Sequence, residues 1–294
     1  MLVSNKWNDY ECIDAGNGEK LERWGNIILR RPDPWALWTH KDTNEWNNYH
    51  AIYHRNDKGG GYWNNRKKFS DYWTVNYRDL TFKVSPTGFK HTGLFPEQAA
   101  NWDFIIDKIQ NAKREIKVLN LFAYTGGATM ASSYAGAIEV VHVDASAGMN
   151  DWAKENAKLS HLENNKIRYI CDDCLKFVER EKRRGNKYDA IIMDPPTYGR
   201  GPSKELWRFE DSLNKLIDAD LPAGRRRRRR SPAGSGLQIL RGPEARWVYR
   251  TACFCSAGRR TDRREKRPGQ RIQRRIYDQS HRKRRSWRAS GEFH

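Results

Sequence analysis

The stretch "IKVLNLFAYTGGAT", residues 116–129, decides the fold class of this chain. Its first seven residues form an apolar run rich in β-forming residues, which predicts a buried strand, and the loop "AYTGGA" leads into a predicted helix. Further strands, with helical stretches between them, are predicted at residues 139–146, 166–173 and 187–194. Strands that alternate with helices at this spacing are typical of an α/β fold, in which helices cover both faces of a parallel sheet.

Glycines and acids stand at the carboxyl ends of these predicted strands. Gly126 and Gly127 follow the first strand, where the absence of a side chain lets the backbone approach a ligand. Asp144 ends the second strand, 18 residues after Gly126 and near the spacing at which an acid reaches a ribose diol. Asp173 and Asp194 end the third and fourth strands. Each feature alone also suits a tight turn or a helix cap, but together they predict a ligand site at this edge of the sheet.

At these motifs the chain resembles the class I S-adenosylmethionine-dependent methyltransferases, in the group related to the large-subunit rRNA (cytosine) methyltransferases. The resemblance spans about residues 10–217 and is carried by "KHTGLFPEQAANWDFI", "VLNLFAYTGGAT", "VHVDAS", "WAKENAKL", "ICDDCLKFV" and "YDAIIMDPPTYGRG". It implies a Rossmann-like domain and S-adenosylmethionine as the cofactor.

The resemblance also implies which residues bind the cofactor. The loop from Phe122 to Gly127 surrounds the methionine part, and Asp144 binds the ribose hydroxyls. Two residues after the third strand, Asp173 and Cys174, lie against adenine. The full implied set is Thr92, Gln98, Asn120, Phe122, Tyr124, Gly126, Gly127, Asp144, Ala145, Asp173, Cys174 and Asp194.

Asn120 departs from the pattern of many class I enzymes, which carry an acid on this strand. An amide can still accept hydrogen bonds, but it brings no charge toward the cationic end of the cofactor. A dinucleotide-binding fold is the natural rival at this motif. That fold expects G-x-G-x-x-G at the start of the helix, and "TGGATMAS" lacks the third glycine.

The segment "MDPPTYGR", residues 193–200, places an acid and two prolines directly after the fourth predicted strand. Pro195 and Pro196 have no backbone donor and a fixed φ, so they end the sheet ladder and stiffen the backbone. Methyl transfer is an in-line displacement that depends on alignment. We therefore expect Asp194 and the Pro195 carbonyl to accept hydrogen bonds from an exocyclic amine, and Tyr198 to stack on a base. The predicted catalytic residues are Asp194, Pro195, Pro196 and Tyr198.

The cysteines give two weaker signals. Cys171 and Cys174 have the spacing of a metal or redox pair, but the other close pair, Cys253 and Cys255, lies in an unrelated Arg-rich segment, so no metal site is predicted. The family resemblance also allows carbon methylation, for which the 5-methylcytosine branch uses a cysteine after a later strand. Residues 175–252 contain no cysteine, which leaves only Cys253 and Cys255 as weak candidates.

Residues 1–90 are predicted to form a small β-rich domain ahead of the methyltransferase domain at residues 91–218. Seven of the twelve tryptophans lie in the first region, where short strands and a Gly-rich turn are predicted. These aromatic residues are expected to form the core of that domain. Alternatively, they form an RNA platform in which exposed rings stack on bases and the basic side chains of Arg30, Arg31, Arg66, Lys67 and Lys68 bind phosphates.

The charge of the chain is concentrated in residues 219–294. This segment holds 21 Arg and 2 Lys against 6 acidic residues, whereas the preceding 218 residues hold 32 basic and 30 acidic ones. The change follows a helix predicted from Ser203 to Ile217, and six consecutive arginines stand at 225–230. We predict a disordered, out-of-frame tail with no further strand of comparable quality, so that the sheet is incomplete and its fourth strand has an unpaired edge. The competing hypothesis is a genuine arginine-rich RNA-binding arm.

The sequence thus predicts a methyltransferase that acts on RNA, most plainly on a base of rRNA. Two alternatives are an arginine-rich nucleic-acid-binding protein with a catalytically dead methyltransferase fold, and a methyltransferase of small molecules or proteins. No apolar run approaches 18 residues and the N-terminus has no apolar stretch of signal-peptide length, so we expect a cytoplasmic protein without a membrane partner.

Overall fold

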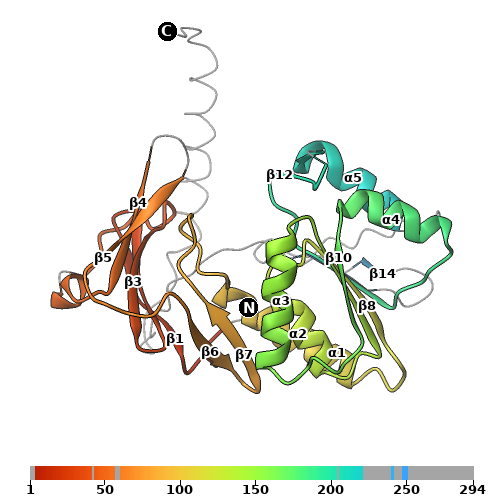
Figure 1. Cartoon of the computed structure of the whole chain (residues 1–294), viewed down its shortest axis with the longest axis horizontal. Coiled ribbons are helices and arrows are strands. Elements are labelled where there is room, and N and C mark those ends of the chain that lie inside the picture. The colour runs from red at the N-terminus through yellow and green to blue at the C-terminus, as the bar shows by residue number, and fades with distance from the viewer. Residues whose placement is uncertain are drawn as a thin grey trace, which may run out of the picture. The chain divides into compact units, whose positions relative to one another are not determined.

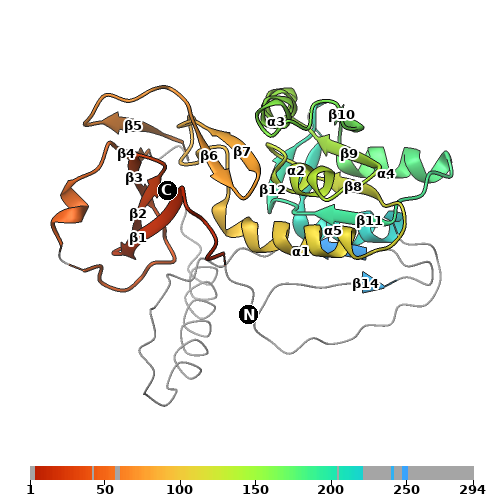
Figure 2. The ribbon, with the colours of Figure 1, turned by 90° about the horizontal axis from the view of Figure 1, so that it is seen from below.

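A computed structural model gives the fold of residues 4–41, 43–56, 60–203, 205–220, 240–241 and 247–250. Its elements can be followed in Figure 1 and, from below, in Figure 2. The central sheet contains the four predicted strands, all parallel: β8 (Lys117–Leu121), β9 (Glu139–Asp144), β10 (Ile167–Cys171) and β11 (Ala190–Met193). The prediction of an α/β class with a parallel sheet is confirmed.

Helices pack against the two faces of this sheet in two separate groups. One apolar cluster joins Val118 and Val140 of the sheet to the helices α1 (Ala99–Gln110), α2 (Gly127–Tyr134) and α3 (Ala147–Leu159). The other joins Leu119 and Val141 to α4 (Cys174–Arg183) and α5 (Phe209–Asp220). Neighbouring residues of a strand therefore enter opposite clusters, as the alternation of side chains along a strand requires. Both faces are buried, which explains the nearly continuous apolar runs of the sequence.

The prediction that the fourth strand has an unpaired edge is wrong. The described residues include β14 (Leu240–Arg241) and β15 (Trp247–Arg250), and β15 pairs in parallel with β11, so the edge of the fourth strand is covered. The sheet order is β10-β9-β8-β11-β15-β14. The sequence "WVYR" of β15 has the aromatic and β-branched residues that favour strands, but four residues are too few to show a periodic pattern. The arginine run at 225–230, and with it the predicted disorder and frame error, lies outside the described residues.

The helix predicted from Ser203 starts later than expected. Residues Leu206–Arg208 form β13, which pairs antiparallel with β12 (Tyr198–Arg200), and α5 begins at Phe209. Helical spacing of the apolar residues is only a weak preference, and pairing with β12 overrides it for these three residues.

The N-terminal strands form a five-stranded sheet and a separate hairpin. The sheet has the order β1 (Tyr10–Gly16), β2 (Glu19–Trp24), β3 (Ile27–Pro32), β4 (Ala51–Arg55) and β5 (Gly61–Asn65), and the hairpin is β6 (Trp73–Tyr77) with β7 (Leu80–Val84). Phe82 of the hairpin and Trp102 of α1 belong to one buried cluster, which crosses residue 90. The domain boundary predicted there stays a prediction.

Burial of one ion pair holds β2 against β3. Glu22 is fully buried and accepts two hydrogen bonds from Arg31, at 2.6 and 2.9 Å. Burial alone would raise the pKa of Glu22, but Arg31 and Lys20 outweigh it and lower this pKa to about 2. Arg31 is only 5% exposed, so the alternative that its side chain binds phosphate from the solvent is wrong. The Arg31 guanidinium therefore has a structural role, in which it neutralises the buried Glu22 carboxylate.

We expect the Glu22→Gln variant to lose about 3 kcal/mol of unfolding free energy, because it leaves the Arg31 charge buried without its counterion. Since the folded pKa of Glu22 lies below its unfolded value of about 4.3, the pair stabilises above that pH and the effect disappears as the pH falls toward 2. Urea unfolding at pH 7 and pH 3 measures both effects. Glu19→Gln is the control, because its pair with Arg30 is partly exposed and is worth less than about 1 kcal/mol. Equal losses in both variants at pH 7 would contradict the assignment.

Candidate active site

The loop after β8 has an unusual backbone. Phe122 and Tyr124 have positive φ angles of 54° and 51°, and Gly126 has a φ of 87°. A left-handed conformation is uncommon for residues other than glycine and costs free energy, so it persists only where the surroundings enforce it. Backbone of this kind is concentrated at functional sites.

Asp144 at the end of β9 enforces this conformation. Its carboxylate accepts hydrogen bonds from the backbone N–H of Tyr124 at 2.8 Å and from that of Ser146 at 2.9 Å. Burial raises the pKa of Asp144, and these two bonds oppose the rise without cancelling it. Each carboxylate oxygen has two lone pairs, so Asp144 retains acceptor capacity for a ligand hydroxyl.

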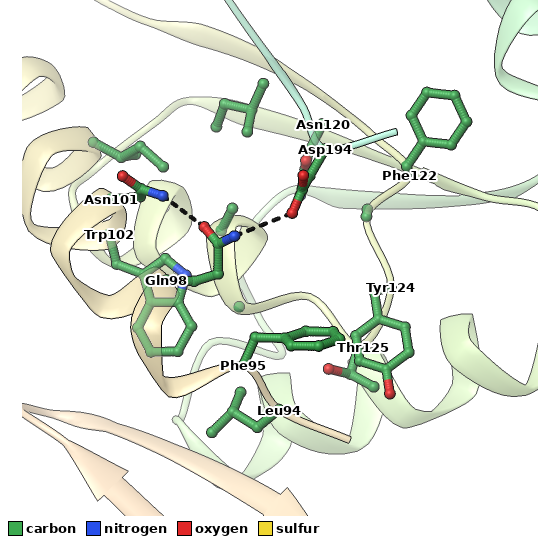
Figure 3. A pocket seen from close by; sticks show the side chains of 15 residues that line it. Leu94, Phe95, Gln98, Asn101, Trp102, Asn120, Phe122, Tyr124, Thr125 and Asp194 are labelled. Atoms are coloured by element: carbon green, nitrogen blue, oxygen red, sulfur yellow. Dashed lines mark hydrogen bonds between the residues drawn. The ribbon is translucent and has the colours of Figure 1, made fainter. Parts of the chain in front are cut away.

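A pocket opens beside this loop, and Figure 3 shows the side chains that line it. Six predicted site residues line it: Gln98, Asn120, Phe122, Tyr124, Gly127 and Asp194. Ala123 and Thr125 of the predicted loop Phe122–Gly127 line it as well. The structure adds residues that the sequence did not single out, namely Leu94, Phe95, Asn101, Trp102, Ile105, Ala128 and Ile192. Most of these precede or belong to α1, within the stretch "GLFPEQAANWDFI" that carried part of the family resemblance.

A chain of two hydrogen bonds connects α1 to the segment after β11. Asn101 donates to Gln98 at 2.6 Å, and Gln98 donates from Nε2 to Asp194 Oδ2 at 3.1 Å, as Figure 3 shows. Gln98 and Asp194, 96 residues apart in the sequence, therefore meet at the pocket.

A neutral polar chain lies beneath the pocket. Asn120 donates to Thr129 Oγ1 at 2.9 Å, and Thr129 Oγ1 lies 2.9 Å from His142 Nδ1. Burial lowers the pKa of His142 to about 3, so its ring is neutral near pH 7. The direction of the hydrogen bond between Thr129 and His142 depends on the tautomer of the histidine ring. The Oδ1 atom of Asn120 takes no part in this chain and can accept a hydrogen bond from a ligand.

Gly127 has a packing role. A Cβ atom at this position would lie 2.6 Å from Cζ2 of Trp102, an approach that real Cβ atoms do not make. The glycine therefore lets the indole of Trp102 pack against the start of α2 and form a wall of the pocket. The neighbouring Gly126 precedes α2 as its N-cap residue, and its positive φ gives a separate reason for glycine there.

The remaining predicted cofactor residues lie around the pocket rather than in its lining. Asp173 is the N-cap of α4 and accepts from the Lys176 N–H at 3.0 Å. Cys174 is buried, burial raises the pKa of its thiol, and its Sγ accepts from the Phe122 N–H at 3.3 Å. Thr92 is fully buried, and within the described part of the chain its Oγ1 atom has no hydrogen-bond partner. Ala145 follows Asp144 directly.

The Asp-Pro-Pro segment is held by the hairpin that follows it. Trp207 donates from Nε1 to the Pro196 carbonyl at 2.7 Å, and its ring lies 4.7 Å from that of Phe122. Trp207 therefore connects the two loops at the carboxyl ends of β8 and β11. Tyr198, by contrast, is 56% exposed and so is accessible to a partner from the solvent.

No metal site is found in the part of the chain that the structure describes. Among these residues, no group of three or more His, Cys, Asp or Glu side chains could hold an ion. Cys171 is exposed and Cys174 is buried, and both are free thiols.

The residues present fit S-adenosylmethionine, the cofactor that the resemblance implies. A ribose needs acceptors such as the Asp144 carboxylate, and the amino-acid part of the cofactor needs polar partners such as Asn120 Oδ1.

We expect Gly127→Ala to lower the unfolding free energy by about 1–3 kcal/mol, because Trp102 must move away from the added methyl group. Urea unfolding followed by tryptophan fluorescence measures this change. Gly148→Ala is a matched control: it lies in the first turn of α3, where a Cβ would meet nothing nearer than Ser146 Oγ at 3.9 Å. The control should be neutral or slightly stabilising. A Gly127→Ala variant as stable as the control would reject the packing role.

Curated relatives support the resemblance. A protein named ribosomal RNA large subunit methyltransferase K/L from Syntrophotalea carbinolica is 34% identical over 151 residues, which are 51% of this chain and 20% of that protein. The protein of the same name from Shewanella frigidimarina is 37% identical over 137 residues, which are 47% of this chain and 18% of that protein. The chain thus spans about a fifth of the length of these relatives.

A solved structure and a family model agree with them. The S-adenosylmethionine-dependent methyltransferase from Agrobacterium tumefaciens is 42% identical, with a TM-score of 0.70 over 73% of this chain and 68% of that chain. A family model described as S-adenosylmethionine-dependent methyltransferase matches residues 48–226, more than half of the chain, and includes β8 to β11 with the pocket. The chain therefore belongs to the S-adenosylmethionine-dependent methyltransferase family.

Proposed function

We propose that this protein transfers a methyl group from S-adenosylmethionine to a base of ribosomal RNA. The names of the curated relatives support the substrate class, since they act on large-subunit ribosomal RNA. The observation that carries the proposal is the hydrogen bond between Gln98 and Asp194, two residues that line the pocket. Asp194 stands directly before the two prolines in the sequence, and the exposed Tyr198 follows them. An acceptor, a rigid backbone and an exposed aromatic ring are the parts that a base with an exocyclic amine requires.

The cofactor side of the site is proposed from the geometry around Asp144. This carboxylate binds ribose hydroxyls with the lone pairs that Tyr124 and Ser146 leave free. Asn120, Phe122, Tyr124 and Gly127 surround the methionine part, and Asp173 and Cys174 border the adenine through their backbone, because the Asp173 side chain caps α4 and the Cys174 side chain is buried.

The acceptor side holds the substrate. When bound, S-adenosylmethionine supplies an electrophilic methyl carbon. Asp194 accepts a hydrogen bond from the substrate amine and orients it, while Gln98 holds the carboxylate in place. The Pro195 carbonyl provides a second hydrogen-bond acceptor, and its position is restricted because the proline rings fix the backbone φ angles. Tyr198 stacks on the target base or its neighbour.

The proposal includes a cytoplasmic location, where ribosomal RNA would be met. The described helices include none that is long and apolar enough to cross a membrane.

Asp144→Asn should weaken binding of S-adenosylmethionine at least tenfold. The amide group cannot accept from both backbone N–H groups, so the variant loses one support of the left-handed loop and one charged acceptor for the ribose. Isothermal calorimetry measures the affinity. Asp151→Asn, an exposed acid on α3 that pairs with Lys154, is the control and should leave it unchanged. An unchanged affinity in Asp144→Asn would reject the cofactor site, and tighter binding of a nicotinamide dinucleotide would favour the rival fold.

Asp194→Asn and Tyr198→Ala should lower kcat about 10- to 100-fold, and should reduce methyl transfer more than they reduce the affinity for S-adenosylmethionine, since both residues are assigned to the acceptor side. Tyr198→Phe keeps the ring and should keep most of the activity. Transfer of labelled methyl groups to rRNA from cells that lack the protein is the assay. Labelling of protein or small molecules in place of rRNA would reject the substrate. Cofactor binding without any transfer would favour a catalytically dead fold.

A further inference from the structure

A group of basic side chains gathers where the N-terminal sheet meets residues 85–95. Lys20 and Arg31 are paired positions on β2 and β3. Arg31 donates to the backbone carbonyl of Lys90 at 2.9 Å, and Lys90 Nζ donates to the Pro32 carbonyl at 3.4 Å. These bonds attach the segment that carries Lys90 to the C-terminal end of β3, so the basic residues are held together by the fold.

The positive charges in this group exceed the negative ones. Lys20 and Arg31 share the buried Glu22. Lys90 and Arg55, in contrast, have no carboxylate within 4.0 Å among the residues that the structure describes. Asp33 lies near enough to Lys90 to favour its charged form, but it does not form an ion pair with it.

Burial and the mutual repulsion of these charges lower the pKa values of Lys90 and His91. Burial, with added repulsion from Arg55, Lys20 and Arg31, lowers the pKa of Lys90. Burial and the same positive neighbours lower the pKa of His91 to about 4, so His91 is neutral near pH 7. Like charges held together in a partly buried place cost free energy, and a bound anion relieves that cost.

An aromatic side chain lies beside the basic group. Phe89, next to Lys90, is 62% exposed. The segment before Phe89 is fixed, because Trp63 donates to the Thr87 carbonyl at 2.8 Å and Tyr53 donates to the Gly88 carbonyl at 3.4 Å. An exposed ring on a fixed backbone next to an unpaired cation is the arrangement that binds a base and its phosphate.

Ring contacts connect the basic group to the pocket. The ring of His91 lies 5.2 Å from that of Phe95, and the ring of Phe95 lies 5.4 Å from that of Tyr124. Phe95 and Tyr124 both line the pocket, as Figure 3 shows. The distance from the basic group to the pocket is therefore spanned by three contiguous rings.

We infer that Lys90 and Arg55, together with the exposed ring of Phe89, bind the phosphate backbone and one base of single-stranded RNA next to the target nucleotide. The inference rests on the proposed function, because it assigns part of the RNA to a surface beside the same pocket. Lys90 and Arg55 supply charge to the phosphate, and Phe89 stacks on a base whatever its identity. This site contributes affinity and position, whereas the choice of target base belongs to the pocket.

The test compares three full-length variants with the wild type: the double variant Lys90→Ala/Arg55→Ala, Phe89→Ala, and the control Lys158→Ala, which removes one exposed charge from α3. The substrate is rRNA from cells that lack the protein. We expect the first two variants to raise KM for rRNA about 5- to 20-fold with kcat and S-adenosylmethionine affinity unchanged, and the control to leave KM within about twofold. Unchanged cofactor affinity also shows that the variants fold.

A crosslinking experiment separates this site from other basic parts of the chain. A 12-nucleotide RNA that contains 4-thiouridine is irradiated with each full-length protein, and the crosslinked peptides are identified by mass spectrometry. We expect a crosslink at or next to Phe89 that the double variant loses, and a salt dependence of binding that falls by about 0.7 per lost phosphate contact.

The outcomes distinguish the two proposals. Methylated rRNA with equal KM in all variants, and no crosslink near Phe89, would overturn the inference and leave the proposed function standing. A crosslink at Phe89 that the double variant loses, without methylation of rRNA, would support the RNA site and reject rRNA as the substrate. Complete competition by free AMP at the concentration of the RNA would overturn the inference in favour of a mononucleotide site.

Discussion

The hydrogen bond from the Tyr124 N–H to the Asp144 carboxylate is the contact on which the site depends. Left-handed backbone at Phe122 and Tyr124 costs roughly 1–2 kcal/mol for each residue. The bond to Asp144 offsets part of that cost, and the Ala123 N–H adds a second bond to the Val143 carbonyl at 3.1 Å. Because β8 and β9 run parallel in register, with Leu121 opposite Val143, the end of one strand sets the shape of the loop after the other.

Two tryptophans pack against the residues of this loop and of the helix that follows it. Trp102 of α1 fits against Gly127 and closes one side. Trp207 of β13 packs on Phe122 and donates to the Pro196 carbonyl, which holds the Asp-Pro-Pro segment against the loop after β8. Trp102 of helix α1 thus lines the pocket itself, whereas Trp207 of hairpin β12–β13 supports the loops that border it. Neither tryptophan is assigned a catalytic role. Trp102 packs on the backbone at Gly127, and Trp207 holds the backbone at Pro196.

The N-terminal strands contribute to the same core. Trp152 of α3 donates to the Lys83 carbonyl at 3.1 Å, and Asn156 accepts from the Lys83 N–H at 2.8 Å, so hairpin β6–β7 is attached to the helix that follows β9. The buried Glu22–Arg31 pair orders the neighbouring sheet, and Arg31 continues to the Lys90 carbonyl. The charge of Arg31 is thus neutralised within the N-terminal region by Glu22. Lys90 and Arg55, in contrast, have no ion-pair partner among the described residues.

The sequence by itself determined the α/β class, the four parallel strands and the acids at their carboxyl ends, because apolar runs of strand length and strand-terminal acids are local patterns. Tertiary structure decided what local patterns cannot encode. Residues 206–208 pair with β12 instead of starting a helix, and four residues at Trp247–Arg250 cover the edge of β11, because pairing with a distant strand outweighs local preference. Trp102 resembles an ordinary core residue of a helix in the sequence, and only packing against Gly127 makes it part of the pocket. Arg31 resembles a surface cation until a buried carboxylate is placed beside it, since the environment of a charge depends on residues far away in the chain.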